Sequence, residues 1–167
     1  PLTNYNVLVL DQTLKNNSSV SLVNTNVLRS GNAYDANVTS ALFDFNNKKN
    51  TWNIGGNVSF SNIIESGGKT TTGYAHSIYF GKTSGRFTFN IWQDLFNDKY
   101  NKRDLGFFTN NNTMDQGFWA GYNWTKPKGW YNQMRVNING WYSRLVSPID
   151  ILRRKEMMYQ NAGVNLN

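Results

Sequence analysis

The sequence predicts an all-β protein, an antiparallel up-and-down transmembrane β-barrel, of which about nine strands lie in this chain. Three observations predict it: apolar and polar residues alternate, the strand segments are long, and short connections alternate with longer ones. Outer-membrane barrels combine these features, because each strand crosses the bilayer between a short periplasmic turn and an outer loop.

The alternation is clearest from Thr51 to Ile64, where every second residue is apolar or small. Successive side chains of a strand point to opposite faces, so such a segment has one apolar and one polar face. We expect these residues to face lipid: Ile54, Val58, Phe60, Phe87, Phe89, Ile91, Val136 and Ile138. We expect these to line the lumen: Asn53, Asn57, Arg86, Thr88, Asn90, Trp92, Arg135, Asn137 and Asn139.

The predicted strands are Asn6–Leu14, Ser19–Arg29, Tyr34–Phe45, Thr51–Ile64, Thr71–Thr83, Arg86–Phe96, Gln116–Lys126, Trp130–Val146 and Tyr159–Leu166. Tight turns are expected at Asn16-Asn17 and at Pro127-Lys128-Gly129, and long loops at Asn97–Asp115 and Ser147–Met157. The second loop has the pattern of a short helix over Ile149–Tyr159. The continuous apolar run from Val7 to Leu10 fits a strand covered on both faces by a plug or another domain, and equally a chance departure from alternation.

The composition excludes several classes of protein. The chain has 167 residues, no cysteine and no apolar run of the length that a membrane helix needs, so we expect no disulfide, thiolate metal site or helical span. Pro1 begins the chain without a signal-peptide pattern, and both ends carry strand-like sequence. We therefore interpret residues 1–167 as part of one barrel domain of a longer polypeptide.

Aromatic residues make up 15% of the chain and gather near the predicted strand ends. The residues Trp52, Trp124, Trp130, Tyr131, Trp141 and Tyr142 fit an interfacial girdle at the level of the lipid headgroups. Stacking on sugars or bases is the alternative. By strand parity Trp92 and Trp119 fall on the polar face, which makes them the aromatic candidates for contact with a ligand in the lumen.

The net charge of +7 fits nucleic acid, an anionic membrane surface or an acidic ligand. The basic residues lie in connections at both ends of the predicted strands, whereas nucleic-acid binding requires one contiguous basic surface. We therefore expect outer-membrane lipid and lipopolysaccharide as partners, together with other outer-membrane or periplasmic proteins, and no nucleic acid.

No catalytic constellation is apparent, so we predict that the segment is not an enzyme. His76 is the only histidine, and the dispersed acidic residues single out no glycosidase pair. We predict no metal site and no cofactor.

Two stretches resemble a known family: Tyr5–Leu14 followed by Asn24–Tyr34, and Lys99–Asn112 with its Asp104-Leu105-Gly106 core. They are similar to Bacteroidota (Gram-negative) outer-membrane proteins with a barrel domain of unknown function behind a domain like carbohydrate-binding module family 9. The resemblance implies a larger barrel in the cell outer membrane and an upstream sugar-binding-like domain. Family-specific function is expected in the loop that carries Asp104, Leu105 and Gly106.

These observations predict a barrel segment that acts as a pore, receptor or scaffold. One alternative is a soluble β-sandwich that binds carbohydrate, and another is part of a glycoside hydrolase. The strand total, the solute and the state of the lumen are not determined by this sequence.

Overall fold

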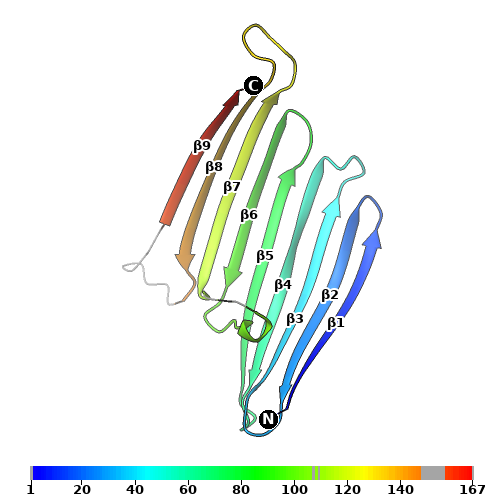
Figure 1. Cartoon of the computed structure of the whole chain (residues 1–167), viewed down its shortest axis with the longest axis vertical. Coiled ribbons are helices and arrows are strands. Elements are labelled where there is room, and N and C mark those ends of the chain that lie inside the picture. The colour runs from blue at the N-terminus through cyan, green and yellow to red at the C-terminus, as the bar shows by residue number, and fades with distance from the viewer. Residues whose placement is uncertain (1, 107, 109, 148–156, 167) are drawn as a thin grey trace.

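The computed structural model describes residues 2–106, 108, 110–147 and 157–166, the last range by its backbone. These residues form one antiparallel sheet whose strands follow one another in chain order (Figure 1). The strands are β1 (Thr3–Leu14), β2 (Ser18–Arg29), β3 (Asp35–Asn46), β4 (Trp52–Ile64), β5 (Thr70–Lys82), β6 (Phe87–Phe96), β7 (Thr113–Trp124), β8 (Met134–Leu145) and β9 (Met157–Leu166). A 3₁₀ turn, η1 (Arg103–Leu105), lies between β6 and β7.

The predicted all-β, antiparallel, up-and-down arrangement is confirmed, and the sheet is open. β1 and β9 lie at opposite edges and do not pair with each other (Figure 1). The described strands make a single sheet and not the two facing sheets of a sandwich.

The connections divide between the two ends of the sheet. Residues 15–17, 47–51, 83–86 and 125–133 lie at one end, which we call the short-turn end. Residues 30–34, 65–69 and 97–112 lie at the other, which we call the long-loop end. Asn16 and Asn17 have φ of +62° and +55°, in the left-handed region that asparagine tolerates, and the tight turn predicted there is confirmed.

Two predictions about the connection between β7 and β8 are wrong. The tight turn at Pro127-Lys128-Gly129 belongs to the longer connection 125–133, and β8 begins at Met134, not at Trp130. A local bridge between Lys128 and Tyr131 takes this segment out of the ladder. Most of the predicted loop Ser147–Met157 and of the helix over Ile149–Tyr159 lies outside the described residues, and Met157–Tyr159 belong to β9.

The strand register fixes which side chains share a face. Directly paired residues point the same way, so Ile54 of β4, Phe80 of β5 and Ile91 of β6 form one continuous row. We call the side of this row the apolar face. Asn90 of β6, Trp119 of β7 and Asn139 of β8 form a row on the other side, which we call the polar face.

Candidate functional site: the polar face and its loop

The apolar face carries every residue expected to face lipid. The register places on it Ile54, Val58, Phe60, Phe87, Phe89, Ile91, Val136 and Ile138. Large apolar side chains here are about half exposed, with 48% for Phe60, 49% for Ile91 and 51% for Ile138. Single exposed hydrophobic residues are ordinary, but a contiguous row across neighbouring strands marks a surface that meets something other than water.

The polar face carries the residues expected in the lumen. The register places on it Asn53, Asn57, Thr88, Asn90, Trp92, Arg135, Asn137 and Asn139. Arg86 lies one residue before β6, in a turn, and is exposed. Asp44 also lies on this face, where it accepts hydrogen bonds from Tyr79 and from Asn53 (3.0 Å). The carboxylate is thus held by neutral donors of β4 and β5.

Glycines of β7 on the polar face accommodate two indole rings, one from the neighbouring strand β6 and one from β7 itself. A Cβ at Gly117 would lie 2.4 Å from the Trp92 ring, and a Cβ at Gly121 would lie 2.8 Å from the Trp119 ring. The Arg135 guanidinium lies 5.4 Å from the centre of the Trp119 ring. Both indoles therefore pack along the sheet itself, and the structure gives them a structural role that the sequence did not predict.

The aromatic residues expected in a girdle lie at both ends of the sheet. Trp52, Trp124, Trp130 and Tyr131 are at the short-turn end, and Trp130 is 75% exposed. Trp141 and Tyr142 lie towards the end of β8 instead. Trp141 is paired with Gly117, which places it on the polar face, so it cannot belong to a girdle on the apolar face. The face of a strand residue depends on its parity and not on its distance from the strand end.

The apolar face becomes polar towards the long-loop end. The Asn24 amide donates to Thr39 (2.7 Å), and the Asn26 amide donates to Asn24 (2.7 Å). His76 hydrogen-bonds Tyr74 (2.7 Å) and Gln93 (3.1 Å), so the lone histidine is one member of a hydrogen-bonded group. The apolar band thus occupies part of each strand, and amide and ring groups border it on the long-loop side.

The connection between β6 and β7, residues 97–112, lies against the polar face, and we call it the β6–β7 loop. Tyr100 is only 3% exposed, and a Cβ at Gly73 of β5 would lie 2.2 Å from its Cα. The backbone amide of Asn101 donates to the Ser61 hydroxyl of β4 (2.9 Å). The loop can lie this close because position 73 has no side chain. In Figure 1 the loop with its short helical turn lies over the ends of β4 and β5.

Asp104, in the middle of the β6–β7 loop, binds residues at the end of β2 and in the connection that follows it. It forms an ion pair with Arg29 of β2 and accepts a hydrogen bond from the Tyr34 hydroxyl (3.2 Å). Burial, followed by the negative charge of Asp104, raises the pKa of Tyr34. Asp104 belongs to the loop core that the sequence predicts as functional, whereas Leu105 is 44% exposed and Gly106 has no atom near its missing Cβ. Arg29 was missed, because nothing in a single sequence pairs residues 75 positions apart.

Aromatic rings support the loop from below. The rings of Phe96, Tyr100 and Phe108 lie in mutual contact, with centroids 5.7 to 5.8 Å apart. The Lys102 ammonium lies 5.4 Å from the Phe108 ring centre and 5.9 Å from that of Phe96. Burial raises the pKa of the Tyr100 phenol, and a hydrogen bond with Ser59 partly offsets the rise.

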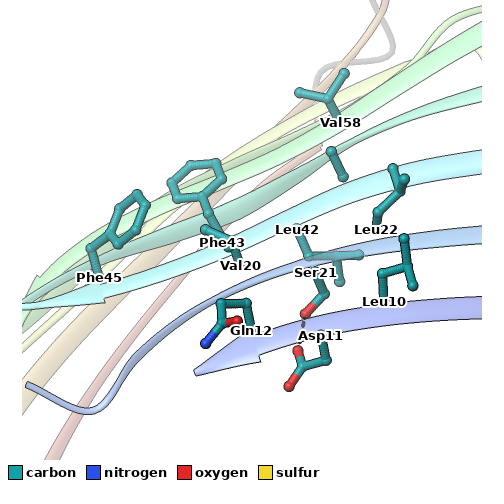
Figure 2. Close-up of a pocket in the computed structure, with 11 residues that line it drawn as sticks. Leu10, Asp11, Gln12, Val20, Ser21, Leu22, Leu42, Phe43, Phe45 and Val58 are labelled. Atoms are coloured by element: carbon teal, nitrogen blue, oxygen red, sulfur yellow. Dashed lines mark hydrogen bonds between the residues drawn. The ribbon is translucent and has the colours of Figure 1, made fainter. Parts of the chain in front are cut away.

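A shallow depression over β1–β4 has a volume of about 700 Å³. Figure 2 shows Phe43, Phe45 and Val58 on one side of the strands and Asp11 on the other, where Ser21 donates a hydrogen bond to it. Because apolar side chains dominate it, this depression offers a polar ligand few partners. Within the described ranges no group of three or more histidine, cysteine or acidic residues is placed to hold a metal ion.

No helix among the described residues is long and apolar enough to cross a membrane.

Comparison with known proteins gives one match. No curated protein and no solved structure matches the chain. A family model described as a domain of unknown function (DUF5916) matches residues 1–165, nearly the whole sequence. The chain therefore belongs to the DUF5916 family.

Proposed function

We propose that this chain forms part of the wall of an outer-membrane β-barrel that acts as a pore, receptor or scaffold. In this proposal the apolar face meets lipid, and the polar face, with the β6–β7 loop against it, lines the lumen. The observation that carries the proposal is the half-exposed apolar face, which extends across the sheet while the opposite face carries amides and charges.

The dimensions of the sheet support this proposal. The strands have 10 to 13 residues each, and a tilted strand needs about 9 to 11 residues to cross a bilayer. Strands of soluble proteins are usually about 5 to 6 residues long. Amide groups border the apolar band at the long-loop end, and Trp52 and Trp130 border it at the short-turn end, as expected at the two interfaces of a membrane.

The free edges of β1 and β9 require partners in this proposal. Unpaired backbone groups are costly in lipid, so a spanning sheet must close on itself. We infer that further strands pair with β1 and β9 to complete the barrel. The resemblance to Bacteroidota outer-membrane proteins adds an upstream sugar-binding-like domain, lipopolysaccharide as a neighbour and a link to carbohydrate binding or uptake.

Fractionation of the full-length protein, followed by gel mobility with and without boiling, tests the proposal. We expect recovery in the outer membrane and a mobility shift on boiling, because closed barrels resist detergent until they are heated. A water-soluble, unshifted product would contradict the proposal. Quenching of its tryptophan fluorescence by oligosaccharides would then favour the sandwich-like sugar-binding alternative.

A further inference from the structure

The β6–β7 loop packs closely against the polar face and carries positive charges that are not ion-paired among the described residues. Tyr100 is buried against the sheet (3% exposed), and the loop backbone crosses directly over Gly73. The Asn111 amide donates to the backbone carbonyls of Asp98 (2.7 Å) and Tyr100 (3.2 Å), which ties the two arms of the loop together. Such a loop has a fixed shape against the polar face.

The charges of the loop are unevenly satisfied. Asp104 is neutralised by Arg29, and this is the ion pair that the structure records among the described residues. Lys99 and Arg103 are exposed, and Lys102 is held above two aromatic rings. Asp98 is the remaining carboxylate of the loop, so outside the ion pair the loop carries three cations, of which Lys99 and Arg103 are exposed, and one anion.

The polar face has carboxylates of its own, and they do not cancel these cations. Asp94 and Asp115 lie on β6 and β7, whereas the loop crosses away from those strands towards Arg29 of β2. Neither lies within ion-pairing distance of Lys99, Lys102 or Arg103 in the described residues.

A hollow beside the loop gives these cations a place to act. It has a volume of about 340 Å³, and its polar lining consists mainly of Lys99, Arg103, Asn101 and Asn111, with Asp98 as the one carboxylate among the described lining residues. Cationic and amide donors around one hollow suit the oxygens of a carboxylate or phosphate group.

We propose that the β6–β7 loop is the selectivity element of the lumen, which narrows it and favours anionic solutes through Lys99, Lys102 and Arg103. The inference rests on the proposed pore function. Because the loop is fixed to the wall by Gly73, Ser61 and Arg29, its cations hold a constant place in the path of a solute. Solutes that carry carboxylate or phosphate groups are the class it fits.

Single-channel recordings of the full-length protein in planar bilayers, under a potassium chloride gradient, test the charge effect. Arg103→Glu changes the local charge by two units on an exposed side chain. Seen from about 8 Å in water, this change disfavours a monovalent anion by about 1 kcal/mol and favours a monovalent cation by the same amount, so we expect about a 30-fold fall in the anion-to-cation permeability ratio. Lys49→Glu, in the turn at the short-turn end, is the matched control and should leave the ratio unchanged.

A second pair of variants tests the narrowing. Gly73→Val places a side chain where the loop backbone lies, so it should displace the loop and raise the conductance. Gly67→Val is the control, because nothing lies within 4 Å of its Cβ position. Equal permeability ratios and conductances in all variants would overturn the inference and leave the pore intact. Absence of conductance from the unaltered protein would overturn the pore function, and this inference with it.

Discussion

Replacing Ile138 with arginine distinguishes between two environments of the apolar face, the interior of a lipid bilayer and water. Ile138 lies within β8 on the apolar face, is 51% exposed, and is paired with Ala120, whose small side chain leaves room for a larger neighbour. An arginine near the bilayer midplane of a barrel costs about 2 to 4 kcal/mol. In water, a polar substitution at so exposed a site changes stability by about 0.5 kcal/mol or less.

The assay is urea unfolding of the full-length protein refolded in lipid vesicles. The expected loss corresponds to a fall of roughly 30- to 700-fold in the folding equilibrium constant. Asn139→Arg is the control, because it is the next residue of the same strand and lies on the polar face. Equal and small losses for Ile138→Arg and Asn139→Arg would refute the assignment of the two faces.

Three further predictions follow. Gly117→Leu should destabilise the sheet by about 1 to 3 kcal/mol, because its Cβ would lie 2.4 Å from the Trp92 ring. Urea unfolding checks this, with Gly67→Leu as the control because nothing lies within 4 Å of its Cβ position. Burial raises the pKa of Tyr100, so the folded state holds the phenol proton more tightly than the unfolded state does. Docking of the loop should therefore be fully stable below pH about 10 and weaken above it. Amide hydrogen exchange across residues 98–106, measured against pH, checks this, and the pH dependence should be absent in Tyr100→Phe. Asp104→Asn removes the ion pair to Arg29 and leaves the strand pairing intact. It should therefore speed proteolysis within the β6–β7 loop without changing the midpoint of global unfolding. An unchanged rate of proteolysis would mean that the contacts of Tyr100 and Ser61 are enough to hold the loop.

The strands could be predicted from the sequence because their signal is local. Alternation from Thr51 to Ile64 depends on parity within one segment, and the observed β4, Trp52–Ile64, begins one residue later. The same parity places Asn90 and Ile91 on opposite faces. Where the expectation departed from parity, as at Trp141, the structure differs from it.

The arrangement of the loop could not be predicted, because it depends on contacts between distant segments. Residues 97–112 have the sequence of a long polar connection. Nothing local indicates that Tyr100 is buried or that position 73 must lack a side chain. The partner of Asp104 is Arg29 of β2, three strands away from Gly73 of β5. Sequence patterns indicate which residues share a strand face, but not which connection folds over it.

The order of the strands has a consequence for how this chain folds. Every pairing joins neighbours in the sequence, so each hairpin closes over a short span and costs little chain entropy. Sheet growth can therefore proceed one hairpin at a time. The contact between Arg29 and Asp104 instead spans 75 residues, and it requires that β2 to β6 are already assembled. We therefore expect the loop to dock only after β2 to β6 have paired, as a late step on a sheet that has already formed.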